Sequence, residues 1–249
     1  MSARPASARI LGIRVDNVDQ TEAIERLLAL AESGGTHQVV TVNPEFIMRA
    51  QTDEAFRAVL LAADLALADG VGLLWAARFL GAPLRGRATG TDSLILLAPH
   101  AARRGLSFFL LGAAPGVAEA AAARLQREVP GLRIAGTYAG SPSPEEEAEI
   151  VERVRQAAPH FLFVAYGAPQ QDLWIARNLK RLGVPVAMGV GGAFDYVSGR
   201  APRAPAILRR VGLEWLYRLI RQPWRWRRML ALPQFALRVL RFRLRGEQI

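Results

Sequence analysis

Residues 107–125 read SFFLLGAAPGVAEAAAARL: an apolar run, a turn that holds two glycines, and a stretch of helix-forming residues. This order of strand, turn and helix is the building unit of parallel α/β folds. Amide groups at the start of such a helix suit a diphosphate, which points to Gly112 as a phosphate contact. The turn lacks the Lys-Ser/Thr of a Walker loop, and any α/β fold needs a glycine turn here. A phosphate site and a purely structural turn therefore both stay open.

Similar apolar runs on both sides of this unit alternate with stretches of helical period. We expect these further strands at 9–15, 38–42, 65–68, 133–137, 161–165 and 184–190. The clearest helix is 143–157, where Ser143 can cap the start, Pro144 suits the first turn and three glutamates complement the helix dipole. The sequence predicts an α/β fold with a Rossmann-like, mostly parallel sheet flanked by helices.

The composition bounds the class of protein. Of 249 residues, 51% are apolar types and 22% are charged, as in ordinary globular proteins and unlike disordered or collagen-like chains. The chain has no cysteine, which excludes disulfides, thiolate zinc sites and cysteine nucleophiles and fits a reducing cytoplasm. The first ten residues lack the apolar run of a secretion signal. The most apolar window, 58–77, contains Asp64 and Asp69, so we expect no transmembrane helix there.

The positive charge is concentrated at the C-terminal end. Residues 200–249 hold thirteen arginines and two glutamates, a formal charge of +11, which leaves −1 for residues 1–199. We therefore expect a Rossmann-like catalytic domain over 1–199 and a basic, amphipathic helical appendage over 200–249. Such a segment should seek phosphate in an anionic lipid, a nucleic acid or a pyrophosphate-bearing substrate.

Within the appendage, basic and apolar residues alternate at helical spacing. Four arginines recur at intervals of three or four residues: Arg218, Arg221, Arg225 and Arg228. Leucine, isoleucine and tryptophan side chains between 213 and 226 supply apolar bulk, and Pro223 and Pro233 should break the segment into shorter helices. This pattern is typical of a helix on an anionic membrane surface. An ordinary helix pair packed on the sheet is the alternative, and a nucleic-acid groove is less favoured because no reader motif accompanies the charge.

Ligands of open parallel sheets bind beyond the carboxyl ends of the strands, and several polar residues follow the expected strands directly. Asp69 ends an apolar run beside Gly70, which suits a general base facing a cleft, although a helix cap is the simpler reading of the residue alone. Arg87 lies among small residues and suits phosphate or carboxylate, with a solvated loop as the alternative. Gln171 follows another strand, where an amide suits sugar hydroxyls or a helix cap.

Nothing in the sequence predicts a metal site or a cofactor. The three histidines, His37, His100 and His160, have no companions at metal-ligand spacing. No Asp-x-Asp pair occurs, which removes the usual carboxylates that hold a divalent ion against a nucleotide diphosphate. If a diphosphate binds, arginines and helix amides must neutralise it.

Six motifs together resemble the WecG/TagA/CpsF glycosyltransferase family through nearly the whole chain. They are Thr-Val-Asn-Pro-Glu at 41–45, Ala-Asp-Gly at 68–70, Arg-Ala-Thr-Gly-Thr-Asp at 87–92, Gly-Ala-Pro-Gln-Gln-Asp at 167–172, Gly-Val-Gly-Gly-Ala-Phe-Asp at 189–195 and Gly-Leu-Glu-Trp-Leu-Tyr-Arg at 212–218. The family's usual Gly-x-Pro-Lys-Gln-Glu departs here at Gln170, which loses a charge, and at Asp172, which shortens a carboxylate. These departures concern donor or acceptor identity more than reaction type.

The resemblance implies an inverting, metal-independent transfer of a sugar from a UDP-sugar to a polyprenyl-diphosphate-linked sugar. The donor sugar would be N-acetylmannosamine or a related hexose or uronic acid, and the product a precursor of a surface polysaccharide or teichoic acid. The enzyme would lie on the cytoplasmic, inner face of the plasma membrane, docked on anionic lipid through residues 200–249, which would also help to close the site. Self-association is left open, and no nucleic-acid partner is expected.

The resemblance also implies roles for single residues. Asp69 would be the general base. Thr41, Asn43, Arg87 and Gln171 would line the same pocket, Tyr138 and Asp195 would lie near the uridine, Gly112 near the diphosphate, and Arg218 with Arg225 or Arg228 would neutralise the leaving diphosphate. The competing reading is a non-catalytic nucleotide- or nucleic-acid-binding protein with a basic tail and Asp69 as a helix cap.

Overall fold

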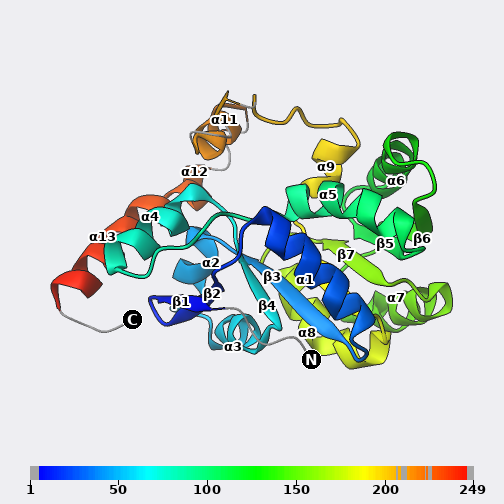
Figure 1. Ribbon diagram of the computed structural model, residues 1–249, viewed down its shortest axis with the longest axis horizontal. Coiled ribbons are helices and arrows are strands. Elements are labelled where there is room, and N and C mark those ends of the chain that lie inside the picture. The colour runs from blue at the N-terminus through cyan, green and yellow to red at the C-terminus, as the bar shows by residue number, and fades with distance from the viewer. Residues whose placement is uncertain (1–5, 206, 209–211, 222, 224–225, 246–249) are drawn as a thin grey trace.

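A six-stranded parallel sheet in the order β4-β3-β8-β7-β5-β6 forms the centre of the molecule (Figure 1). The computed structural model describes residues 6–205, 207–208, 212–221, 223 and 226–245, and for Arg218 and Arg227 it describes the backbone alone. The strands are β3 (His37–Val42), β4 (Leu65–Ala68), β5 (Ser107–Gly112), β6 (Arg133–Tyr138), β7 (Phe161–Ala165) and β8 (Val186–Gly189). Every strand pair in this sheet is parallel, which confirms the predicted α/β, Rossmann-like class.

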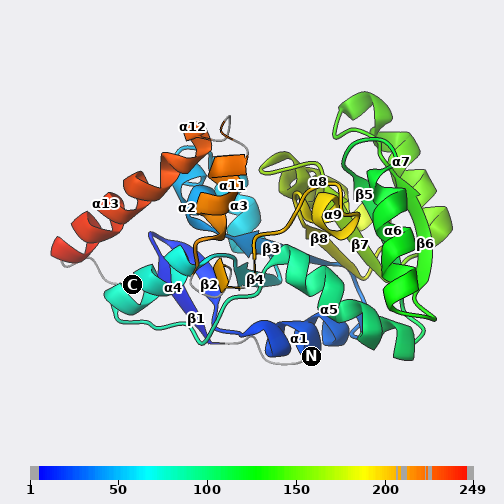
Figure 2. The ribbon, with the colours of Figure 1, turned by 90° about the horizontal axis from the view of Figure 1, so that it is seen from above.

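Helices cover both faces of the sheet, which is why the central strands are continuous apolar runs. On one face lie α1 (Gln20–Glu32), α5 (Gly90–Arg103), α6 (Val117–Glu128) and α9 (Ala193–Val197), which share a buried cluster with alternate strand residues such as Phe108 and Leu110. On the other face lie α7 (Pro144–Ala157) and α8 (Gln170–Leu182), packed on Phe109 and Leu111. Figure 2 shows α1 and α5 on one side of the sheet and α8 on the other.

The expected first strand at 9–15 is wrong, because the chain turns back within it. Ser7–Ile10 (β1) and Ile13–Asp16 (β2) form an antiparallel hairpin, with Leu11 and Gly12 at positive φ in the turn. Two consecutive residues at positive φ are characteristic of a tight hairpin turn, which Asn-Gly or Asp-Gly usually signals. In Leu11-Gly12 only the glycine is a residue type that commonly adopts positive φ, so the sequence does not indicate a turn and the apolar run predicts one strand.

Two other expectations need correction in detail. The strand expected at 184–190 is the shorter Val186–Gly189. The helix expected at 143–157 forms as Pro144–Ala157, but the side chain of Ser143 makes no capping hydrogen bond. The carboxylate of Glu145 instead accepts hydrogen bonds from the Glu145 backbone amide and from the Ser143 hydroxyl, and both lower the pKa of Glu145.

The appendage is helical as predicted. It contains α11 (Glu214–Arg221), α12 (Trp226–Met229) and α13 (Ala231–Leu244), with Pro223 between the first two. Pro233 does not break α13, because it lies in the first turn, where its missing N–H costs no hydrogen bond. None of the helices in the described part of the chain combines the length and the apolar content needed to span a bilayer.

One helix of the appendage is packed into the body. Phe235 and Val239 of α13 are buried in the same apolar cluster as the β1–β2 hairpin, α2 (Pro44–Arg49), α3 (Glu54–Ala62) and α4 (Val71–Leu80). α13 therefore lies against α2 and α4, beside the carboxyl ends of β3 and β4 (Figure 1). The division of the chain at residue 200 into two domains stays a prediction.

Candidate functional site

A cavity of about 760 Å³ opens beyond the carboxyl ends of β3 and β4, between α4 and the appendage. It brings together four residues that the sequence singled out from four separate segments: Asn43, Asp69, Arg87 and Arg228. Its other wall is apolar and comes from α4 and α13. A polar end with a carboxylate and guanidinium groups, continued by an apolar groove, suits an amphipathic ligand.

Asp69 is held in place by the backbone on both sides of it. Its N–H donates to the carbonyl of Val42 at 2.7 Å, which extends the β3–β4 ladder one residue beyond the strand. The carbonyl of the preceding Ala68 accepts from the N–H of Ala88 at 2.8 Å. Gly70, at φ 109°, takes the N-cap position of α4. The half-buried side chain of Asp69 thus lines the cavity from a rigid strand end, the placement that a general base needs.

Thr41 and Asn43 belong to the same strand and its following turn, but they do different things. Asn43 caps α2, because its side-chain oxygen accepts the N–H of Phe46 at 2.9 Å, and it also lines the cavity. Thr41 is buried and does not line the cavity. Its methyl group lies against Gly90, where an added Cβ would be 3.6 Å away. Thr41 therefore packs behind the residues that line the cavity and does not line it itself.

The segment 87–92 ties the cavity to the start of the appendage. Arg87 lines the cavity. Thr89 caps α5 by accepting the N–H of Asp92 at 3.1 Å, and its hydroxyl donates to the Asp92 carboxylate at 2.9 Å. The other oxygen of Asp92 accepts from Arg203 at 2.7 Å. The motif thus fixes the chain that leads out of the sheet toward α11.

Gln171 organises the turn after β8 rather than lining the cavity. Its side-chain oxygen accepts the N–H of Gly191 at 2.9 Å. Gly189 leaves room for this side chain, because a Cβ there would lie 2.5 Å from the Gln171 amide nitrogen and 2.7 Å from an Asp172 oxygen. Gln171 is 2% exposed. In this structure it holds the backbone of the glycine turn, and a direct sugar contact stays a prediction.

Asp172 is a fully buried carboxyl group. Neither of its oxygens has a hydrogen-bond partner among the described residues. Burial raises the pKa of Asp172 to about 7, and the neighbouring Gln171 amide offsets only part of that rise. The side chain of Asp172 therefore ends inside the core.

We expect Asp172→Asn to make the protein more stable at alkaline pH. Because the folded-state pKa is raised above the ordinary value of 3.8, the protonated carboxyl stabilises the fold at low pH, and that stability is lost as the pH rises through about 7. The melting temperature of the variant should exceed that of the wild type by roughly 5 °C at about pH 8. At about pH 5 the difference should be much smaller. Melting curves at both pH values measure it, and an equal difference at both would contradict the assignment.

The residues expected around the nucleotide lie farther along the same sheet edge. Gly112 ends β5 at φ 102°, where a Cβ would lie 2.9 Å from the backbone of Ala165. Tyr138 ends β6, with the Arg153 guanidinium 4.3 Å from its ring centre. At about 4.8 Å per strand spacing, β5 and β6 lie about 19 and 24 Å from β4. Asp195, in the first turn of α9, follows β8, which is two spacings from β4. The expected residues therefore form two groups on one edge rather than a single pocket.

The arginines of the appendage are only partly described. Arg228 makes a two-pronged ion pair with Glu45, at 2.8 and 2.9 Å, which joins α12 to α2 at the cavity. The guanidinium of Arg221 lies 5.7 Å from the ring centre of Tyr217. Arg218 belongs to α11, but its side chain lies outside the described residues, as does the whole of Arg225.

Sequence reasoning missed three residues of the cavity. Glu45 was quoted within a motif, but nothing in the sequence identified Arg228 as its partner. Trp75 and Phe79 are 74% and 48% exposed on α4 and line the apolar wall. Their spacing of four residues, offset from the buried Leu73 and Leu80, was the signal that could have revealed a second apolar face on this helix.

A second hollow lies apart from this cavity. A hollow of about 480 Å³ between α7 and α8 is lined by Glu152, Arg155, Lys180 and Arg181, far from the carboxyl ends of β3 and β4. Across the ranges that the structure describes, no three histidine, aspartate or glutamate side chains gather as metal ligands would.

Comparison with known proteins found a matching family model and named relatives. The sequence model described as "Glycosyl transferase WecG/TagA/CpsF family" matches residues 8–249. A Bacillus spizizenii protein named N-acetylglucosaminyldiphosphoundecaprenol N-acetyl-beta-D-mannosaminyltransferase is 36% identical over 203 residues, which cover 82% of this chain and 78% of that protein. A Staphylococcus aureus protein of the same name is 31% identical over 236 residues, which cover 94% of this chain and 92% of that protein.

Proposed function

The chain belongs to the WecG/TagA/CpsF family of glycosyltransferases, and on that premise we propose that it moves a sugar from a UDP-sugar to a polyprenyl-diphosphate-linked sugar. The donor sugar is N-acetylmannosamine or a related hexose or uronic acid, because the relatives from Bacillus and Staphylococcus are named for N-acetylmannosamine transfer. The observation that carries the proposal is the Asp69 carboxylate in a cavity of about 760 Å³ that also holds Arg87 and Arg228.

In the proposed reaction a hydroxyl oxygen of the acceptor sugar attacks the anomeric carbon of the donor. Asp69 takes the hydroxyl proton as the new C–O bond forms. The bond between the anomeric carbon and the diphosphate oxygen breaks, and UDP leaves with the electron pair. Attack from the face opposite the leaving group inverts the anomeric configuration. The rigid backbone bonds at residues 68–69 keep the base in position.

The leaving diphosphate needs positive charge, and we propose that arginines and helix amides supply it without a metal. The absence of an Asp-x-Asp pair supports this, because that pair usually holds the divalent ion. Gly112 and the start of α6 offer backbone amides, and Arg218 with Arg225 or Arg228 offers guanidinium groups. Tyr138 and Asp195 would contact the uridine, and Thr41, Asn43, Arg87 and Gln171 would shape the side where the sugar lies.

The test is a donor screen in the presence of EDTA. The purified protein is incubated with a panel of UDP-sugars and a short-chain polyprenyl-diphosphate N-acetylglucosamine, and the products are weighed by mass spectrometry. A mass gain of one hexose derivative in EDTA supports the transferase, its donor and its independence of metal together. UDP binding without product for any donor would favour the non-catalytic nucleotide-binding alternative.

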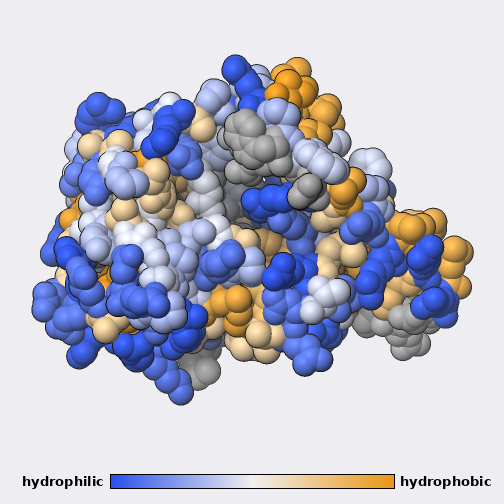
Figure 3. Space-filling view, turned by 180° about the vertical axis from the view of Figure 1, so that it is seen from behind, coloured by the Kyte–Doolittle hydropathy of each residue, from blue (hydrophilic) through white to orange (hydrophobic). Residues whose placement is uncertain are grey.

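We further propose that the enzyme works on the inner face of the plasma membrane, building a precursor of a surface polysaccharide or teichoic acid. The charge of +11 over residues 200–249 supports docking on anionic lipid. Figure 3 shows apolar surface over α11 and the outer end of α13. The exposed large apolar side chains in the described part of the appendage include Leu213, Trp215, Leu216, Ile220, Trp226, Leu230, Leu237, Leu240 and Leu244.

Ile220→Ser should weaken binding to vesicles that contain anionic lipid. Ile220 is 72% exposed on α11, so its removal leaves the core intact and takes away apolar area that would enter the interface. The loss of one buried isoleucine should lower vesicle affinity on the order of tenfold in a sedimentation assay. Leu96→Ser is the matched control, since Leu96 is 46% exposed on α5 and belongs to none of the helices α11, α12 and α13. Equal affinities of the two variants would contradict the docking face.

A further inference from the structure

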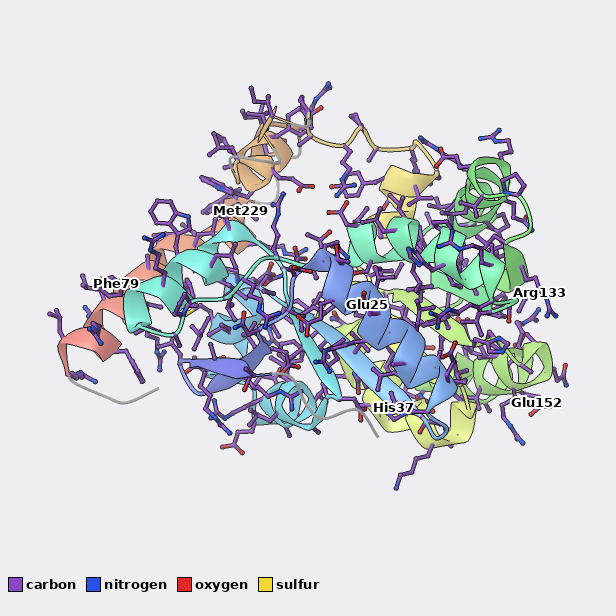
Figure 4. The ribbon with its side chains drawn as sticks, in the orientation of Figure 1. Glu25, His37, Phe79, Arg133, Glu152 and Met229 are labelled. Atoms are coloured by element: carbon purple, nitrogen blue, oxygen red, sulfur yellow. The ribbon has the colours of Figure 1, made fainter. Side chains whose placement is uncertain are left out.

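The apolar wall of the cavity forms a corridor between two helices, which we call the α4–α13 corridor. Its lining includes Trp75, Ala76 and Phe79 from α4 and Leu232, Ala236 and Leu240 from α13. Along each helix these residues are one, three or four positions apart, so they follow one another turn by turn. Figure 4 labels Phe79 on α4 and Met229, the last residue of α12, on the side of the molecule where α4 and α13 run together.

Both helices start at the polar end of the cavity. α4 begins at Val71, two residues after Asp69. α13 begins at Ala231, three residues after Arg228. The corridor therefore leads away from Asp69 along the ten residues of α4, which span about 15 Å. A ligand whose reacting end lies at Asp69 must place whatever follows it in this corridor or in solvent.

The corridor has large apolar walls and a floor of small residues. Trp75, at 74% exposure, and Phe79, at 48%, are large apolar side chains that the packing of the body leaves uncovered. Three of the lining residues, Gly72, Ala76 and Ala236, are small, which leaves space for a thin chain. Exposed apolar side chains that line a groove are typical of a binding surface.

We propose that the α4–α13 corridor binds the first isoprene units of the acceptor's lipid chain. This inference rests on the proposed function, which makes the acceptor a sugar linked through diphosphate to a polyprenyl chain. The sugar would lie at Asp69, the diphosphate at the junction beside Arg228, and the chain in the corridor. The corridor supplies what the polar end cannot: a means to distinguish a lipid-linked acceptor from a free sugar phosphate.

Two features favour a prenyl chain over a second protein copy as the occupant. The corridor is continuous with the candidate catalytic cavity, so its occupant and the reacting group belong to one molecule. Beyond Leu240, the last residue of α13 that lines the corridor, the helix continues for one turn to Leu244, which is 77% exposed. A chain that leaves the corridor there would pass directly onto the apolar surface proposed to meet the bilayer.

The test fills the corridor and compares acceptors that differ only in their lipid. Ala236 is exposed on α13, so Ala236→Trp occupies the corridor without disturbing the core. N-acetylglucosaminyl diphosphate is supplied with either a geranylgeranyl or an ethyl group, in buffer without vesicles. The wild type should prefer the prenylated acceptor on the order of 100-fold in kcat/KM, because the prenyl chain buries many more carbons. Ala236→Trp should reduce that preference at least about tenfold.

Ala123→Trp is the matched control, because Ala123 is exposed on α6, outside the corridor. The double variant Trp75→Ser/Phe79→Ser removes the walls instead of filling the space and should have the same effect as Ala236→Trp. A prenyl preference that is the same in the wild type, in Ala236→Trp and in the double variant would overturn the corridor.

Calorimetric binding of geranylgeranyl diphosphate separates this inference from the proposed function. If no UDP-sugar gives product but Ala236→Trp still weakens that binding relative to Ala123→Trp, the corridor stands and the transferase proposal fails. If transfer occurs while both variants bind geranylgeranyl diphosphate as the wild type does, the transferase stands and the corridor fails.

Discussion

Asp69→Asn is expected to lower turnover by about 100-fold or more while UDP binding stays within about twofold of the wild type. The amide matches the carboxylate in size, but it cannot accept the acceptor's proton. The backbone hydrogen bonds that hold residues 68–69 do not involve this side chain, so the cavity should keep its shape. Single-turnover rates with the best donor from the screen measure the chemistry, and calorimetry with UDP measures donor binding.

The control for this variant is Asp53→Asn. Asp53 caps α3 by accepting the N–H of Phe56 at 3.0 Å, and asparagine caps helices about as well as aspartate. This control should keep full turnover. If Asp69→Asn also retained wild-type turnover, Asp69 would be a structural residue. That result would favour the alternative hypothesis of a non-catalytic nucleotide- or nucleic-acid-binding protein.

Gly212→Ala is expected to lower turnover about tenfold by displacing the start of α11 from the body. Gly212 has φ +79°, a conformation that costs an alanine roughly 1–2 kcal/mol. An added Cβ would also collide with the Cγ2 atom of Val71, in the first turn of α4. Leu213, Glu214 and Trp215, which follow Gly212, line the cavity. The variant should therefore open the site without unfolding the sheet.

Gly34→Ala separates the contact from the backbone strain. Gly34 also has φ +79°, but an added Cβ there would meet no atom within 4 Å. Gly34→Ala should lose only the small amount of melting temperature that the backbone strain costs, and only Gly212→Ala should lose turnover. Equal turnover of the two variants would show that the approach of Gly212 to Val71 plays no part in catalysis.

The sequence predicted the body of the fold well because its signals are local. β4 and β7 begin and end at the expected residues, since each is a short apolar run bounded by polar residues or glycine. The hairpin at Leu11 and Gly12 was missed because only one of its two turn residues is a type that commonly adopts positive φ. The capping role given to Ser143 was wrong because its hydroxyl hydrogen-bonds the Glu145 carboxylate instead.

By itself, the sequence determined the α/β class, the polar residues that follow each strand, the basic appendage and the family. Parallel strands place their carboxyl ends on one edge, so residues there could be chosen as a site before their distances were known. Only the tertiary structure decided which of them meet. Asn43, Asp69 and Arg87 share a cavity because β3 and β4 are neighbours, whereas Tyr138 lies at the opposite edge strand.

The pairing of Glu45 with Arg228 and the corridor between α4 and α13 were likewise decided only by tertiary structure. These partners are 183 residues apart in the chain. Their contact depends on how α13 packs against α2 and α4, through Phe235 and Val239. Helical period fixes which side chains share a face of one helix, but it carries no information about which other helix covers that face.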